Sequence, residues 1–189
     1  MAALRQLLYL LAVALPAWTL AAHALAQAGT PRPVLERQVK AAYLYKFAGF
    51  VEWPEHSFKG ADSALIIGVA GSELLAEQLE RMVAGRHVNG HPVTVRRLRA
   101  GDALAALHIL FVDHSMERAA AGAVYAAARG HSILTVTDAH DGLADGAMIA
   151  FVMADERLRF EVGLRLAQAS GLRISARMLA VAHKVQGAT

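Results

Sequence analysis

The chain of 189 residues contains no cysteine. Disulfide bonds, thiol nucleophiles, cysteine-based zinc sites and iron–sulfur clusters are therefore excluded. The folded protein must be stabilised by its hydrophobic core instead. Hydrophobic residues make up 56% of the chain, so a core of ordinary size for a single domain can form.

A strong excess of charge of either sign is also missing, since the formal net charge is only +3. The only basic cluster is Arg96, Arg97 and Arg99, which is small for an electrostatic nucleic-acid interface. A solvated strand edge explains this cluster better. We therefore expect no nucleic-acid partner.

Long hydrophobic runs are confined to the amino end of the chain. Leu7 to Ala22 is almost entirely apolar, Arg5 precedes it, and Ala24-Leu25-Ala26 offers small residues where a signal peptidase reads them. The run is shorter than the ~20 residues of a membrane span and contains Pro16. This pattern predicts a signal peptide over residues 1–26 and export to the periplasm, in preference to an uncleaved membrane anchor.

The remaining chain predicts a flexible lead-in at 27–33 and a single α/β domain at 34–189, because no linker or composition break divides it. Apolar strand-like runs alternate with helical patterns, which favours a mostly parallel central sheet with helices on both faces, a Rossmann-like three-layer arrangement. Two adjacent late strands predict a C-terminal antiparallel hairpin. The expected helices cover 34–50, 72–84, 116–128, 163–170 and 175–185, and the expected strands cover 64–69, 86–88, 93–95, 108–112, 132–137, 147–153 and 157–162.

The last of these helices rests on one apolar stripe. Ser175 is a suitable N-cap, and the residues Met178, Leu179, Ala182 and Val185 recur at helical spacing. We therefore expect the helix to continue to Val185.

The ligand-binding candidates stand directly after predicted parallel strands, and they are Gly71, Ser72, Asp113, His114 and Asp138. Small ligands of open α/β sheets bind at the carboxyl ends of strands, and the Gly71–Ser72 turn exposes backbone N–H groups that can hold an anion. The turn lacks the third glycine of a dinucleotide site and the lysine of a phosphate loop. An ordinary tight turn is the alternative.

Signals for catalysis are absent from the sequence. The serines near its glycines do not form the Gly-x-Ser-x-Gly elbow of hydrolases, and the carboxylates are scattered. Two groups of potential metal ligands lack an established geometry; they are His87 with His91, and Asp138 with His140 and Asp141. We expect a protein that is not an enzyme and that uses no cofactor and no metal.

The candidates for partner binding are Tyr45, Trp53, Arg157, Arg159 and Glu161. Trp53 is the only tryptophan left after cleavage, and tryptophan and tyrosine are enriched at interface hot spots. Tyr45 lies off the apolar stripe of the first helix, on which Tyr43 and Phe47 fall, so Tyr45 is the better contact candidate. The three hairpin residues alternate along one strand face, which is also the pattern of an ordinary half-exposed strand.

Several segments together resemble the YfiR-like family of periplasmic regulatory proteins, and their order and spacing match across nearly the whole mature chain. The segments are Lys40-Ala41-Ala42-Tyr43-Leu44-Tyr45-Lys46-Phe47 through Trp53-Pro54, His108-Ile109-Leu110-Phe111-Val112, Ile133-Leu134-Thr135-Val136-Thr137-Asp138 followed by Gly146-Ala147-Met148-Ile149-Ala150-Phe151, and Arg157-Leu158-Arg159-Phe160-Glu161-Val162 leading into Gly171-Leu172-Arg173-Ile174-Ser175-Ala176-Arg177-Met178-Leu179.

The resemblance implies a periplasmic α/β protein, often dimeric, that restrains an inner-membrane diguanylate cyclase through the cyclase's periplasmic sensing region. That activity would lower cyclic-di-GMP output and biofilm formation. The chain departs from the family at Leu107, where members often have cysteine, and at Gly163, where an asparagine is common. No disulfide can therefore lock this fold, and any role of that asparagine does not carry over.

Two functions therefore stay open at this point. The first is a periplasmic regulator that binds and restrains an inner-membrane signalling protein, most simply a diguanylate cyclase. The second is a periplasmic sensor or carrier of a small ligand, working with a sensor kinase or an outer-membrane receptor. A hydrolase has the least support, since no catalytic set emerges.

Overall fold

A computed structural model of the chain describes residues 32–60 and 62–187, so the predicted signal peptide lies outside the described residues. The chain divides after Leu35 into two units, and the fold belongs to the unit that begins at Glu36. Among the described residues, the first helix begins at Arg32, two residues before the predicted start.

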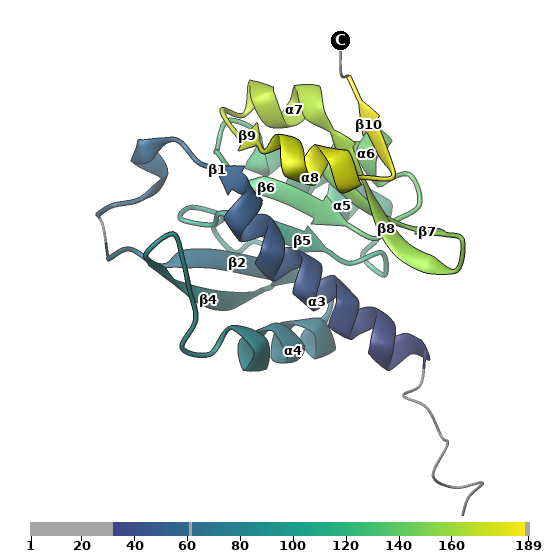
Figure 1. Cartoon of the computed structure of the whole chain (residues 1–189), viewed down its shortest axis with the longest axis horizontal. Helices are drawn as coiled ribbons and strands as arrows, with labels where there is room; N and C mark the ends of the chain where they lie inside the picture. Colours follow the sequence, from purple (N-terminus) through teal and green to yellow (C-terminus); the bar gives the residue numbers. More distant parts are fainter. Residues whose placement is uncertain (1–31, 61, 188–189) are drawn as a thin grey trace, which may run out of the picture. The chain divides into compact units, whose positions relative to one another are not determined.

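Helices and strands alternate along the chain (Figure 1). The helices are α3 (Arg32–Phe50), α4 (Glu73–Val83), α5 (Arg118–Ala128), α6 (Gly142–Asp145), α7 (Leu164–Ala169) and α8 (Ala176–Val181), with a 3-10 turn η1 (Glu55–Ser57). The strands are β1 (Val51–Glu52), β2 (Leu65–Ala70), β3 (His87–Val88), β4 (His91–Leu98), β5 (Ile109–Val112), β6 (Leu134–Thr137), β7 (Ile149–Ala154), β8 (Arg157–Gly163), β9 (Arg173–Ile174) and β10 (Lys184–Gln186).

The main sheet has eight strands in the order β10-β8-β7-β6-β5-β2-β4-β3. Neighbours from β7 to β4 run parallel, β8 runs antiparallel to β7, and β10 runs parallel to β8. The chain leaves β2 for β4 on one side and then returns to β5 on the other side. The strand order therefore reverses beside β2 and β5, and such a switch point is where open α/β sheets form a crevice.

Both faces of the sheet are buried, as the nearly unbroken apolar strands predict. Ile109 and Phe111 of β5 belong to a core cluster shared with α3 and α4. Leu110 and Val112 point to the other face and pack with α5. This gives three layers, with α3 crossing one face and α5 on the far side (Figure 1). The predicted fold class is therefore confirmed.

Two hairpin turns have the positive backbone φ angles that tight turns require. Asn89 and Gly90 both have positive φ, 50° and 89°, and they join β3 to β4. This is the arrangement of the tight hairpin turns that favour Asn-Gly. Asp155 and Glu156, with φ of 50° and 58°, make the corresponding turn between β7 and β8.

The prediction for the last helix is wrong beyond Val181. There α8 ends, and Lys184–Gln186 forms β10 parallel to β8. His183 N–H donates to the Phe160 carbonyl at 2.8 Å, so the chain pairs with an open strand edge instead of completing another turn. Hydrogen bonding to the distant strand β8 thus overrides the helix that the short apolar stripe predicts.

No helix among residues 32–60 and 62–187 combines the length and the apolar character that crossing a membrane requires.

Candidate functional site

The structure gathers most of the predicted ligand-binding residues around the carboxylate of Asp138, at the carboxyl end of β6. The backbone N–H of His114 donates to Asp138 Oδ1 at 2.7 Å, and His114 Nδ1 lies 3.0 Å from Oδ2. Lys40 Nζ, from α3, donates to the same Oδ2 at 2.6 Å. Asp138 is therefore held by three contacts from two other elements, and its side chain is only 5% exposed.

Lys40 connects this network to the helix α3. Its Nζ also lies 2.7 Å from Glu36 Oε1, one helical turn earlier. Burial by itself lowers the pKa of Lys40, but the hydrogen bonds to Asp138 and Glu36 outweigh burial and hold that pKa above its ordinary value. Lys40 is therefore charged at neutral pH and serves as the fixed counter-ion of Asp138.

Gly71 is required by the close approach of the turns that follow β2 and β5. Its φ is +87°, which favours glycine. A Cβ at this position would also lie 3.0 Å from the Cβ of Asp113. Ser115 Oγ donates to the Gly71 carbonyl at 3.4 Å, so the two turns stay joined. The switch point thus brings Gly71, Asp113, His114 and Asp138 together.

Ser72 does not take part in this network. It is the N-cap of α4, and its side chain makes no capping hydrogen bond. Lys40 and Glu36 were missed by reasoning from sequence, because Lys40 and Asp138 are 98 positions apart. Only the Glu36–Lys40 spacing of four residues was a local signal for an ion pair.

The side chains around Asp138 include potential ligands for a metal ion. Within the described part of the chain, Asp113, His114 and Asp138 form the one group whose ligand atoms all lie within 4.8 Å of one another. The ammonium of Lys40 already provides the cation for Asp138, so a metal ion would have to displace it. The residues present fit an ion-pair network better than a metal centre.

A cavity of about 660 Å³ lies beside this network. Its polar wall includes Glu36, Lys40, His114 and Asp138, and its apolar wall comes from the β7–β8 hairpin, with Phe151, Val152, Met153 and Leu158. This volume is ordinary for a small-molecule site. The arrangement can bind a ligand that has one apolar side and one side with polar groups.

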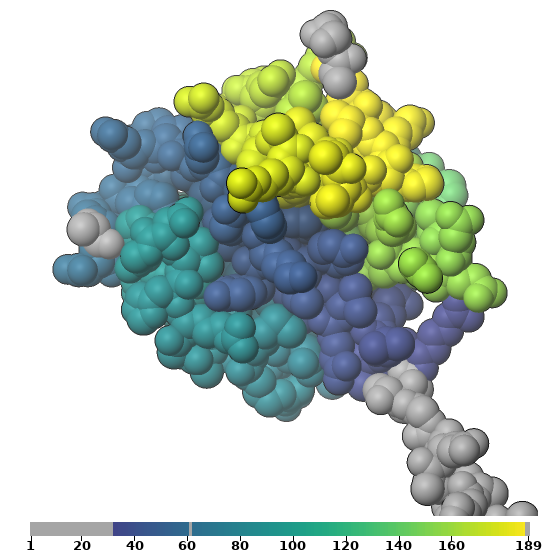
Figure 2. All heavy atoms as spheres, in the orientation of Figure 1, coloured from purple at the N-terminus to yellow at the C-terminus, as the bar shows by residue number. Residues whose placement is uncertain are grey.

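The hairpin also carries three of the predicted partner-binding residues. Arg157 is exposed, and Arg159 and Glu161 are half-buried on the same strand, with Phe160 buried between them. Met153, on the neighbouring strand β7, is 51% exposed. Figure 2 shows this hairpin, in green, at the margin of the surface that faces the viewer.

Tyr45 and Trp53 lie elsewhere and are turned inward. Tyr45 is half-buried against the core, and the Arg86 guanidinium stands 5.4 Å from the centre of its ring. Trp53 Nε1 donates to the His108 carbonyl at 3.2 Å. Both aromatic side chains thus have packing roles within the domain, and the structure does not bring them together with the hairpin residues.

His108 has one defined tautomer when it is neutral. The Ile66 N–H donates to its Nδ1 at 3.1 Å, so Nε2 carries the proton. Burial lowers the pKa of His108; the Ser57 backbone opposes this shift, and nearby His91 adds to it. Phe58 stacks on the His108 ring at 4.3 Å and on His91 at 3.9 Å. His108 is therefore a neutral core histidine.

Within the described residues, the hydroxyl hydrogen bonds of serine do not reach a histidine ring, so serine and histidine do not form a nucleophile–base pair there. The fold and the site define a doubly wound α/β domain with an ion-pair network at its switch point.

The YfiR/HmsC-like family (DUF4154) matches residues 37–183, and the chain belongs to this family. Proteins of this family are in general periplasmic and regulatory rather than catalytic, and they are associated with the control of membrane signalling proteins. The resemblance found in the sequence is thereby confirmed. A comparison with curated proteins finds no match to the chain.

Proposed function

We propose that this protein acts in the periplasm, where it binds the periplasmic region of an inner-membrane diguanylate cyclase and restrains it. The observation that carries the proposal is the extent of the family match, since residues 37–183 include almost the whole described domain. Restraint follows if the protein binds the inactive conformation of its partner more tightly than the active one. The signal that weakens this binding would then release the cyclase.

The β7–β8 hairpin is the surface that we assign to the partner. One of its faces carries the guanidinium groups of Arg157 and Arg159, with Ala154 and Val152 as their cross-strand neighbours on β7. Arginine is enriched in protein interfaces. The two-residue turn at Asp155–Glu156 holds the strands in fixed register, so the surface is formed before binding and little ordering entropy opposes association.

Deletion of the gene is expected to raise cyclic-di-GMP in the host, and crosslinking of the tagged protein in the envelope is expected to capture a membrane cyclase. The double variant Arg157→Glu, Arg159→Glu should lose capture and also raise cyclic-di-GMP. Arg99→Glu is the matched control, because Arg99 is exposed and follows β4, which lies toward the opposite edge of the sheet from β7 and β8. Unchanged cyclic-di-GMP after deletion, under several growth conditions, would defeat the cyclase-repressor proposal.

A second function, a sensor or carrier of a small ligand, is favoured by one specific observation. The network of Gly71, Asp113, His114 and Asp138 opens onto a cavity of about 660 Å³. A ligand that binds only the native state raises the temperature of unfolding. Thermal-shift screening should then find a stabilising compound whose effect is lost in His114→Ala, whereas a blank screen would count against this function.

A further inference from the structure

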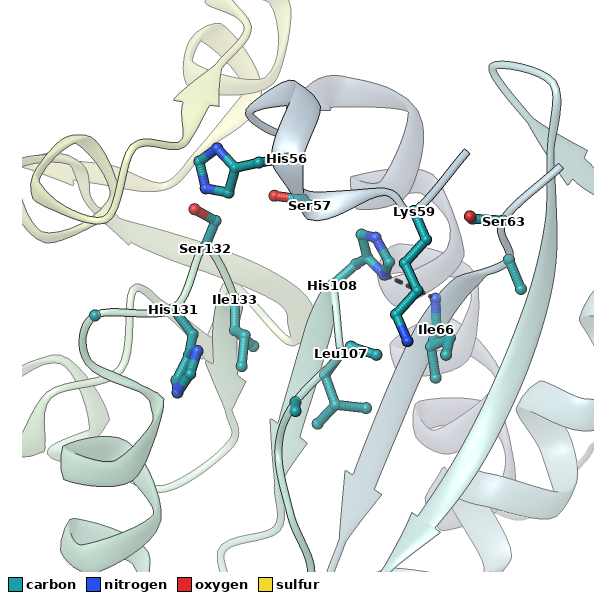
Figure 3. Close-up of a pocket in the computed structure, with 14 residues that line it drawn as sticks. His56, Ser57, Lys59, Ser63, Ile66, Leu107, His108, His131, Ser132 and Ile133 are labelled. Carbon is teal, nitrogen blue, oxygen red and sulfur yellow. Dashed lines mark hydrogen bonds between the residues drawn. The ribbon is translucent and has the colours of Figure 1, made fainter. Parts of the chain in front are cut away.

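A second large cavity, of about 530 Å³, lies at the opposite end of the parallel strands (Figure 3). Its floor is formed where β2, β5 and β6 begin, by Ile66, Leu107 and Ile133. One wall is the segment that contains η1, and the other walls are the turn before β5 and the connection from α5 to β6. This cavity is separate from the switch-point network, since the two share no lining residue.

The lining of this cavity is rich in hydrogen-bond donors and contains no carboxylate. Its polar side chains are one lysine, three histidines and three serines: Lys59, His56, His108, His131, Ser57, Ser63 and Ser132. None of the fourteen lining residues is acidic. A ligand with acceptor atoms suits this lining, and a negative charge is favoured because the lining has a lysine and no carboxylate.

Lys59 is placed to provide the counter-ion. Figure 3 shows its side chain extending into the cavity, with the ammonium group near Leu107 and Ile66. The ion pairs found among the described residues do not involve Lys59. Its hydrocarbon chain also adds to the apolar floor, because lysine can bury its methylene groups while the ammonium stays polar.

The hydroxyl of Ser57 gives an independent indication. Its Oγ is buried and has no hydrogen-bond partner among the described residues. Figure 3 shows Ser57 beside the cavity with Ser132 across from it. Buried polar atoms are nearly always hydrogen-bonded, so the wall beside this cavity contains a polar group that the described residues leave unpaired.

The other large cavity provides an internal comparison. There the ammonium of Lys40 is neutralised by Asp138 at 2.6 Å and by Glu36 at 2.7 Å, and no comparable carboxylate lines the cavity around Lys59. The lysine of the first cavity is paired within the protein, and the lysine of the second cavity is left for a ligand.

We propose that the cavity around Lys59 binds a small monocarboxylate with an apolar body. The carboxylate pairs with Lys59, and the apolar body lies on Ile66, Leu107 and Ile133. The volume is in the range of small-molecule sites. This proposal goes beyond the partner-binding function and does not depend on it.

The test is calorimetric titration of the full chain with four probes: sodium benzoate, sodium hexanoate, sodium acetate and neutral benzamide. Benzoate or hexanoate should bind saturably with a dissociation constant of ~1 mM or tighter. Acetate lacks the apolar body and benzamide lacks the charge, so both should bind at least about tenfold more weakly, which is the effect of one lost ion pair or apolar contact.

Lys59→Met should weaken benzoate or hexanoate binding about tenfold, and Lys59→Arg should restore most of it. Lys59 is exposed, so neither change should affect folding. Lys46→Met is the matched control, because Lys46 is also exposed but does not line the cavity. Absence of saturable binding by both hydrophobic carboxylates, equal binding of benzamide, or full affinity in Lys59→Met would each overturn the proposal.

Discussion

The ion pair between Lys40 and Asp138 makes the sharpest prediction about stability. Its two side chains are 12% and 5% exposed, so breaking it leaves a charge in a poorly solvated place. Removing one partner of a fully buried pair costs about 3–5 kcal/mol. Here the cost is smaller, since Lys40 keeps Glu36 and Asp138 keeps both contacts to His114.

We expect Lys40→Met and Asp138→Asn each to lower the free energy of unfolding by about 2 kcal/mol. The double variant should lose less than the sum, with a coupling energy of about 1–2 kcal/mol, because each single change strands the other member of the pair and the double change strands neither. Urea denaturation at pH 7 measures these values. With a slope of ~2 kcal/mol/M, each single variant should shift the midpoint by about 1 M.

The pair Arg81–Glu77 on α4 is the matched control, because its side chains are 59% and 52% exposed. The same cycle there should give a coupling of no more than about 0.5 kcal/mol. A coupling near zero for Lys40 and Asp138, or one equal to that of the exposed pair, would refute the argument that burial at the strand end makes the network stabilising.

Three further predictions follow from other described residues. Because burial lowers the pKa of His108 below its ordinary value of 6.5, the unfolded chain binds more protons below pH 6.5. The free energy of unfolding should therefore fall as the pH drops through that value, and His108→Asn should flatten the slope in urea titrations from pH 7.5 to pH 5. Gly142→Ala would place a Cβ against the buried Cγ2 methyl of Thr137 and should lower the free energy of unfolding by about 2–3 kcal/mol. Gly122→Ala adds a Cβ in open space on α5 and should raise the free energy of unfolding by about 0.5–1 kcal/mol in the same assay. Trp53→Phe removes the hydrogen bond to the His108 carbonyl and should lower the free energy of unfolding by about 1 kcal/mol. An unchanged free energy of unfolding would argue against that bond.

Much of the fold could be predicted because it follows from local patterns. The apolar runs of β2, β5 and β6 and the helical stripes between them specify a buried parallel sheet, and the turns at Asn89–Gly90 and Asp155–Glu156 join the predicted antiparallel strands. The short elements β1, β9 and β10 were missed. They have two or three residues each, and such strands exist only because a distant edge supplies their hydrogen bonds.

In the candidate site, too, some features follow from the sequence and others only from the tertiary structure. The sequence by itself determined that Gly71, Asp113, His114 and Asp138 follow parallel strands, since strand ends can be located from apolar runs and their polar boundaries. Only the tertiary structure decided that Lys40 of α3 meets Asp138, that Trp53 turns inward and that Lys59 enters a cavity without carboxylates. Local periodicity fixes which face of an element is buried, but the partner across a 98-residue separation is set by how helices pack on the finished sheet.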